Sequence, residues 1–509
     1  MSEHLVNNKR IAKNTMLLYF RMLVMMLISL YTSRVILKTL GVEDYGIYNV
    51  VGGIVAMFGF ITGPMAGTTQ RYITFALGKG NPDELKNVFC TCINIYMVAS
   101  VVLIILCETI GLWFLYNKMQ IPTERMGAAF WVLQFSLSTT VVMLMTIPYN
   151  ADIIAHEKMS AFAYISILES SLKLAIVFVI QVASADRLVL YAVFMLIVQS
   201  AIATYYIIYC IKHFRESKYT FVYDKSLTRE MTGFAGWSLF GNLAAMGSSQ
   251  GVNMLLNVFF GPVVNAARGI SVQVQSAVSQ FVNNFQTALN PQITKSYASG
   301  DYGYMFSLVN KSSRFSFYLV YLLSLPFLIE TSFILNLWLG QIPEYTVIFL
   351  RLILVVSWKN ALVNPLVTVM LATGRIKRYQ QVLGFLLLLT LPISYFALEL
   401  GYPPYTVFIV QLTIEIIAHI IRLYMLKSIV GMPLHKYYKT VLMPIFLVVL
   451  TTLIPAYIMS VFSQGTFATF VYSCVVCTIS GLLAIFLFGV TNQERRFILD
   501  KVLSKIKVV

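Results

Sequence analysis

The chain has 509 residues, of which 58% are hydrophobic and only 11% are charged, and its mean hydropathy is +0.76. This composition excludes a water-soluble globular protein, in which about 25% of residues are charged, and predicts an all-α polytopic membrane protein. A formal charge of +16 would suggest nucleic-acid binding in a soluble protein, but here it first reflects how lysines and arginines are distributed among the loops.

Fourteen apolar runs follow one another along the chain, each long enough to cross about 30 Å of hydrocarbon. The connections between them are short, and the longest, from Lys212 to Arg229, has no room for a separate soluble domain. No cleavable signal peptide is expected, because residues 1–10 are polar and the first apolar run is too long. The predicted spans are 12–38, 46–77, 87–116, 127–150, 160–184, 187–212, 230–259, 265–297, 306–339, 346–373, 379–400, 404–429, 438–462 and 466–490.

The second predicted span contains a basic residue and several residues that affect helix geometry. Gly59, Gly63 and Gly67 are four residues apart, so they lie on one helix face and let another helix approach closely. Pro64 removes a backbone hydrogen bond and bends the helix. Arg71 follows in the same span. The pattern predicts a bent, tightly packed helix that presents a cation to an interior space; the alternative is that Arg71 reaches the cytoplasmic interface.

The distribution of basic residues predicts the orientation of the chain. With the N-terminus in the cytoplasm, 26 of the 37 lysines and arginines fall in cytoplasmic segments and four in the opposite loops. This asymmetry obeys the positive-inside rule and predicts that both termini are cytoplasmic. It also accounts for most of the positive charge, so no nucleic-acid partner is expected.

Eleven charged residues lie within the predicted spans, where a charge usually faces a partner or a water-filled cavity. Lys173 and Lys359 lie near the middle of their spans, and Lys359 has no acidic residue within one helical turn. Arg34, Arg268 and Arg351 are closer to the outer interface, so the alternative for them is an interfacial position. The eleven are Arg21, Arg34, Arg71, Lys173, Arg268, Arg351, Lys359, Glu108, Glu169, Glu330 and Glu415.

Two groups of these residues have a structural as well as a functional interpretation. Glu169 is four residues from Lys173, so the two side chains can form an ion pair on one helix face. Glu415, His419 and Arg422 also share one helix face and are either a proton relay or a structural cluster. Glu169, Glu415 and His419 are therefore the candidates for ion or proton coupling.

Motifs of soluble enzyme chemistry are absent from the sequence. The six cysteines lie inside apolar runs, which predicts neither a disulfide framework nor a metal site. No GxxxxGK[ST], HExxH or nucleophile-elbow motif occurs, so an ATP-hydrolysing pump and a peptidase are unsupported. We expect no enzyme activity, no catalytic residue, no metal and no cofactor; an ion gradient, the membrane potential or the gradient of the cargo remains as the energy source.

An internal duplication with a shift of about 220 residues organises the chain. Leu40-Gly41 recurs as Phe260-Gly261, and Gly80-Asn81 recurs as Gly300-Asp301. Each repeat holds six spans, an even number, so both halves enter the membrane in the same orientation and are related by a pseudo-two-fold axis along the membrane normal. The predicted domains are a six-helix lobe in 1–215, a second six-helix lobe in 216–430, and an appended helix pair with a basic cytoplasmic tail in 431–509.

Together with the fourteen spans, the LGxxxYGxY turn formed by Leu40, Gly41, Tyr45, Gly46 and Tyr48 and the GKGN turn after the second span resemble the bacterial polysaccharide, or O-antigen, flippases. Their superfamily, the multidrug/oligosaccharidyl-lipid/polysaccharide exporters, also contains peptidoglycan-precursor flippases and multidrug and toxin extrusion transporters. The resemblance covers nearly the whole chain. It implies a transporter with a V-shaped pair of lobes around a central cavity that opens alternately inward and outward.

The resemblance also implies a cargo and a membrane. The cargo would be an undecaprenyl-diphosphate-linked oligosaccharide, such as an O-antigen, capsule or exopolysaccharide repeat unit, moved to the outer leaflet of the bacterial inner membrane. Membrane lipid and other polysaccharide-assembly proteins are the further partners expected, and the last two spans would hold the lipid tail. Arginine suits a diphosphate because its planar fork binds two oxygens at once. The expected substrate-binding residues are Arg21, Arg71 and Lys359, assisted by Lys173, Arg34 and Arg268.

Two other functions are alternatives to this one. A drug or cation antiporter of the same superfamily would be expected to hold acidic residues at the centre of its cavity, whereas basic residues within the spans outnumber acidic ones by seven to four. A membrane-embedded polysaccharide polymerase or glycosyltransferase generally needs sizeable outer loops, often with an acidic pair. The chain has short outer loops and no Asp-x-Asp.

Overall fold

A computed structural model describes residues 3–58, 62–117, 119, 121–182, 186–462, 466–496 and 499–500 of the chain. These residues form helices joined by short turns, and they contain no β-strand. Eleven helical segments among them are long and apolar enough to cross a membrane. The prediction of an all-α polytopic membrane protein is therefore confirmed, while the number of fourteen spans stays a prediction.

The chain folds into two compact units, Met1–Leu239 with Thr294–Asp301, and Phe240–Ile293 with Tyr302–Val509. The predicted domain boundaries at 215 and 430 stay a prediction. The first unit contains α1 (Glu3–Phe58), α2 (Thr62–Lys79), α3 (Pro82–Leu106), η2 (Cys107–Gly111), α4 (Leu112–Asn117), η3 (Thr123–Arg125), α5 (Met126–Ala155), α6 (Met159–Val182), α7 (Arg187–His213) and both ends of α8 (Lys225–Ala298). The second unit contains the middle of α8, α9 (Tyr302–Ile329), α10 (Thr331–Leu339), α11 (Thr346–Ala372), α12 (Lys377–Leu388), α13 (Thr390–Glu399), α14 (Thr406–Val430), α15 (Leu434–Tyr437), η4 (Tyr438–Leu442), α16 (Met443–Phe462), α17 (Phe467–Ala484) and η5 (Ile485–Gly489).

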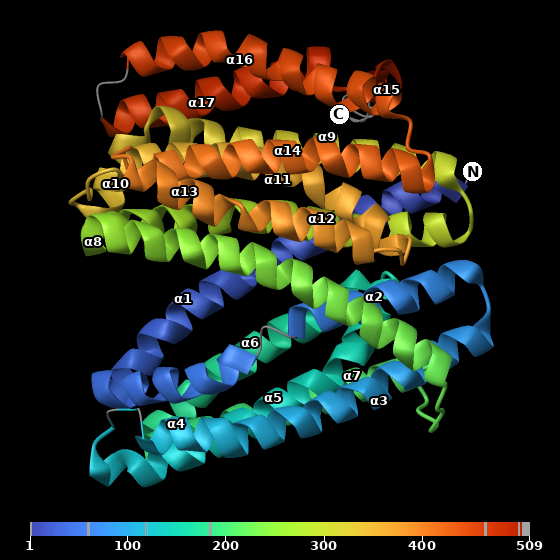
Figure 1. Ribbon diagram of the computed structural model, residues 1–509, viewed down its shortest axis with the longest axis vertical. Helices are drawn as coiled ribbons and strands as arrows, with labels where there is room; N and C mark the ends of the chain where they lie inside the picture. The colour runs from blue at the N-terminus through green and yellow to red at the C-terminus, as the bar shows by residue number, and fades with distance from the viewer. Residues whose placement is uncertain are drawn as a thin grey trace, which may run out of the picture. The chain divides into compact units, whose positions relative to one another are not determined.

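One helix lies at the centre of each unit. In the first, α5 packs against α7, α2, α1 and α3, and its residues Val132 and Leu133 are buried. In the second, α11 packs against α9 and α14, and its residues Phe349 and Leu354 are buried. Figure 1 shows α16 and α17 side by side, and both helices also pack on α9.

The long helices α1 and α8 each contain a kink at a glycine. Gly41 has φ 79° and ψ 170°, and Gly261 has φ 77° and ψ −170°. This backbone conformation is accessible essentially to glycine alone. Gly80 and Gly300, the second pair of the internal duplication, likewise share φ angles of 74° and 78°. The repeated sequence positions therefore carry the same glycine-dependent backbone in both halves of the chain.

Some predicted spans are interrupted in the structure. The span 46–77 covers the end of α1 and most of α2, and residues 59–61 between them, Gly59 included, lie outside the described residues. The span 306–339 is broken at Glu330 into α9 and α10, and 379–400 is divided at Leu389 into α12 and α13. Hydropathy alone predicted a continuous helix across Glu330 and across Leu389, because an apolar run does not reveal where the helical hydrogen-bond pattern is interrupted.

Candidate functional site

Arg21 lies in the first unit, where α1 packs against α6. Its guanidinium carbon is 4.3 Å from the centroid of the Phe162 ring on α6. Its Nε is buried and has no hydrogen-bond partner among the described residues. Glu169 on α6 and Tyr206 on α7 act on it electrostatically. A cation is thus held against an aromatic face beside one carboxylate.

That carboxylate has a second basic neighbour on its own helix. Lys173 Nζ donates to Glu169 Oε1 at 2.5 Å, which forms the predicted pair between residues four apart on α6. One negative charge therefore lies near two positive ones, Arg21 and Lys173. This part of the first unit keeps an excess of positive charge.

Arg71 on α2 is 8% exposed and is surrounded by aromatic side chains of the first unit. Its guanidinium carbon lies 4.3 Å from the ring centroid of Tyr72, 4.7 Å from that of Phe75 and 5.4 Å from that of Phe234. The Tyr72 hydroxyl in turn donates to Glu230 Oε1 at 2.9 Å. The structure places Arg71 inside this unit in an aromatic cage.

Lys359 lies in the second unit and forms an ion pair between two helices. Its Nζ on α11 is 2.7 Å from Glu415 Oε2 on α14 and 3.1 Å from Asn360 Oδ1. Gln411 donates to the other oxygen of Glu415 at 3.0 Å. Glu415 is 56 residues from Lys359, so the sequence around Lys359 does not indicate this partner.

The other members of the predicted α14 cluster have separate partners. Arg422 Nε donates to the Tyr379 hydroxyl at 2.8 Å. Both ring nitrogens of His419 are buried without a hydrogen-bond partner in the described part of the chain. The predicted relay from Glu415 to His419 is therefore not connected by a direct hydrogen bond.

Two further predicted cations, Arg268 and Arg351, have polar partners within the second unit. Arg268 donates to Asn253 Oδ1 at 3.0 Å and to the Ser249 carbonyl at 2.8 Å, so it joins the two arms of α8 on either side of Gly261. Arg351 Nε donates to Thr331 Oγ1 at 3.1 Å. The side chain of Arg34 lies outside the described residues.

A cavity of about 400 Å³ lies in the first unit between α1, α2, α5 and α7. Among its lining residues are the hydroxyl-bearing side chains of Thr62, Ser136, Thr139 and Thr140. The predicted cations whose side chains are described do not line it. This cavity offers neutral hydrogen-bonding groups, and no periodicity in the sequence indicated it.

Membrane-length helices in two units, with charged side chains buried inside each, define a polytopic α-helical membrane protein. No protein-family model and no curated protein matches the chain. Solved structures do match it. A point mutant of a MATE protein has a TM-score of 0.72 and 13% sequence identity, with 84% of this chain and 97% of that chain covered.

Two further structures are similar to the chain at 13% identity. One is a multidrug resistance MATE family transporter of the MOP superfamily in an outward-facing conformation, with a TM-score of 0.69 over 84% of this chain and 97% of that chain. The other is a MOP superfamily transporter from Pyrococcus furiosus, described as having a binding pocket of reverse polarity. Its TM-score is 0.65, with 82% of this chain and 94% of that chain covered. At this identity the likeness shows that the chain has a MATE-like fold.

Proposed function

We propose that this protein is an alternating-access transporter that moves an undecaprenyl-diphosphate-linked oligosaccharide from the cytoplasmic to the outer leaflet of the bacterial inner membrane. The MATE-like fold supports transport. The arrangement around Arg21 supports an anionic cargo, because its buried Nε–H has no acceptor among the described residues and Glu169 acts on both Arg21 and Lys173. Fourteen spans with both termini in the cytoplasm are part of the proposal.

The chemistry of the cargo fits such a site. A diphosphate loses its hydration on leaving water, and charge-assisted hydrogen bonds from a guanidinium replace that hydration. Phe162 on one face of the Arg21 guanidinium leaves the in-plane N–H groups to donate. Glu169 competes for the same cations, which keeps the binding weak enough for release.

Arg71 and Lys359 complete the proposed diphosphate path, with Lys173, Arg34 and Arg268 assisting. Lys359 would have to exchange Glu415 for a phosphate oxygen, so the ion pair between them is a candidate coupling element. The hydroxyl-lined cavity in the first unit suits sugar hydroxyls. An apolar recess of about 450 Å³ on α17 and η5, lined by Leu482, Phe486 and neighbouring apolar residues, suits part of the lipid tail.

Polysaccharide export in cells that lack their own flippase tests the proposal. We expect Arg21→Ala and Arg71→Ala to lower surface polymer at least about tenfold at equal protein levels, because removing a charged hydrogen-bond donor costs about 1.5–3 kcal/mol. Arg229→Ala is the matched control, since Arg229 is exposed on α8. Full export by both interior variants would overturn the cationic path.

A drug or cation antiporter is the second candidate. The fold likeness to a multidrug resistance MATE family transporter favours it, as do the carboxylates of Glu169 and Glu415 inside the two units. Efflux of cationic dyes from cells that express the chain separates the two functions. Efflux that Glu415→Gln abolishes, without any polysaccharide export, would favour the antiporter.

A further inference from the structure

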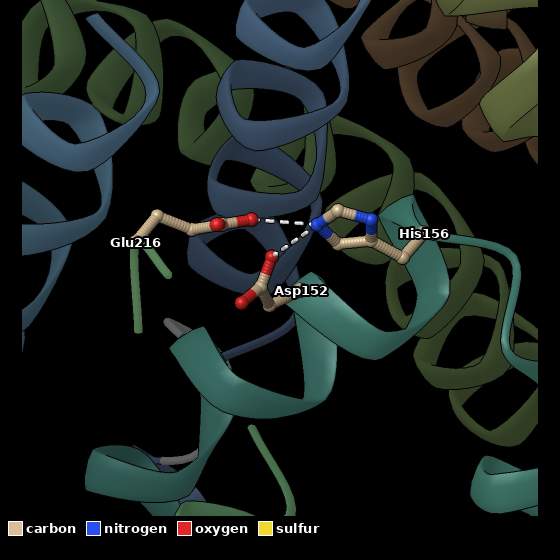
Figure 2. A group of neighbouring side chains, drawn as sticks. All are labelled: Asp152, His156 and Glu216. Carbon is tan, nitrogen blue, oxygen red and sulfur yellow. Dashed lines mark hydrogen bonds and ion pairs between the residues drawn. The ribbon is translucent and has the colours of Figure 1, made fainter. Parts of the chain in front are cut away.

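Three side chains with metal-binding atoms converge at the C-terminal end of α5. Asp152 lies in the last turn of α5, His156 is the residue that caps the C-terminal end of this helix, and Glu216 comes from the segment that follows α7. Figure 2 shows the two carboxylates pointing toward the imidazole. His156 Nε2 lies 2.6 Å from Glu216 Oε1 and 3.6 Å from Asp152 Oδ1, and one ligand atom from each residue lies within 4.8 Å of the others.

The Asp152 carboxylate is the strongest sign of a ligand. Its side chain is fully buried, and its Oδ2 accepts a hydrogen bond from Ser217 Oγ at 2.6 Å. Its Oδ1, the oxygen directed at His156, has no hydrogen-bond partner in the described part of the chain. A buried oxygen without a hydrogen bond costs about 1–3 kcal/mol, and more when it is charged. A cation at this place would remove that cost.

The surrounding residues hold the site in position. The Phe214 ring stacks on His156 with centroids 4.0 Å apart and planes 6° apart, which fixes the plane of the imidazole. Glu157, which follows His156 in the chain, has a backbone φ of 58° and forms ion pairs with Arg10 and Lys295. Glu157 therefore belongs to a neighbouring cluster, and the three converging ligands stand apart from it.

We propose that Asp152, His156 and Glu216 bind one divalent transition-metal ion of the Zn²⁺ class. An imidazole nitrogen with two carboxylate oxygens favours such an ion over Mg²⁺ or Ca²⁺, which prefer oxygen ligands alone. Neighbouring ligand atoms around a four-coordinate zinc ion are about 3.4 Å apart. The separation of Asp152 and His156 fits this value, and Glu216 has to move by about 1 Å. Ser217 then orients the Asp152 carboxylate.

The ion would fasten the segment after α7 to the end of α5. Glu216 and Ser217 both belong to the stretch between α7 and α8. Ser217 contacts Asp152 on α5, and Glu216 contacts His156, which caps that helix. An ion that binds only the folded chain stabilises the folded state. Binding of the metal ion at this site should therefore raise the unfolding temperature of the protein. The site is independent of the proposed transport function, because it uses none of the proposed substrate-binding residues.

Metal binding by the purified full-length chain, made with a tag that contains no histidine, tests this proposal. After treatment with a chelator and dialysis against Zn²⁺, mass spectrometry should find about one tightly held Zn²⁺ per chain. His156→Gln and Glu216→Gln should lose it, and Ser217→Ala should weaken binding about 10- to 100-fold. His213→Gln should keep it, because His213 is an exposed histidine on the last turn of α7.

Two measurements on the unaltered chain keep the test decisive if a variant fails to fold. Zn²⁺ should raise its unfolding temperature where Mg²⁺ does not, and Co²⁺ should produce visible absorption bands of a nitrogen- and oxygen-ligated ion. Absence of stoichiometric Zn²⁺, or Zn²⁺ retained in a folded His156→Gln variant, would show that His156 and Glu216 form only a hydrogen-bonded ion pair.

Discussion

The ion pair between Lys359 and Glu415 gives the sharpest prediction about the second unit. Lys359→Met removes the ammonium and keeps most of the side-chain volume, and Glu415→Gln removes the negative charge and keeps an acceptor. The two side chains are 14% and 10% exposed, so each single change leaves an unpaired charge in a largely buried position. The double variant leaves neither charge.

The distance between the two groups sets the size of the effect. At 2.7 Å and an effective dielectric constant of about 20, the attraction is about 6 kcal/mol, and desolvation of the two ions offsets much of it. Removing one partner of a buried pair should lower the free energy of unfolding by about 3–5 kcal/mol. The free energy of unfolding of the double variant should lie within about 1 kcal/mol of that of the unaltered chain, because the attraction between the two charges and the cost of desolvating them are both removed.

Unfolding in mixed detergent micelles, followed by tryptophan fluorescence, measures these values. Trp358 is a local reporter, since it precedes Lys359 and donates to Ser324 Oγ at 2.6 Å. Lys427→Met is the matched control on α14, where Lys427 is exposed, and it should change the free energy of unfolding by less than about 0.5 kcal/mol. If the double variant lost as much stability as the two single variants added together, the pair would not be coupled and the argument would be wrong.

Two further predictions concern the backbone and pH. Gly41→Ala and Gly261→Ala should each destabilise the chain by about 1–3 kcal/mol. Apart from each glycine's own chain neighbours and the nearby backbone of its helix, no atom of the described residues lies within 4 Å of a Cβ added at Gly41 or Gly261, so the cost arises from the backbone conformation. Gly269→Ala, in a helical and equally open position, should be neutral or stabilising; equal unfolding temperatures for all three variants would contradict this explanation. The second prediction concerns Asp224, where hydrogen bonds from the Leu227 backbone N–H and from Ser226 hold the pKa of the carboxyl below its ordinary value of 3.8. Its ionised form therefore stabilises the start of α8 above that pH, and the stabilisation is lost as the pH falls through the lower folded-state pKa. Between about pH 5 and pH 3 the unfolding temperature of Asp224→Asn should fall less than that of the unaltered chain, and an identical fall would refute the assignment.

Local patterns in the sequence were enough for several parts of the structure. Long apolar runs predicted the helices, because the hydrocarbon of a bilayer requires the chain to satisfy its backbone hydrogen bonds within each span. The spacing of Glu169 and Lys173 predicted their ion pair, since residues four apart meet on one helix face. The repeated Gly41 and Gly261 marked the places where α1 and α8 kink.

Contacts between distant segments could not be predicted in this way. Only the packing of α1 on α6 brings Arg21 to Phe162, and only the packing of α11 on α14 gives Lys359 its carboxylate partner. Asp152 and His156 are only four residues apart in the sequence, but Glu216 joins them from 60 residues beyond His156. Periodicity reports which face of a helix a side chain occupies, whereas the partner on the opposite face depends on how the helices pack. The sequence by itself therefore determined that charged groups lie within the membrane-length helices, and the tertiary structure decided which of them are paired.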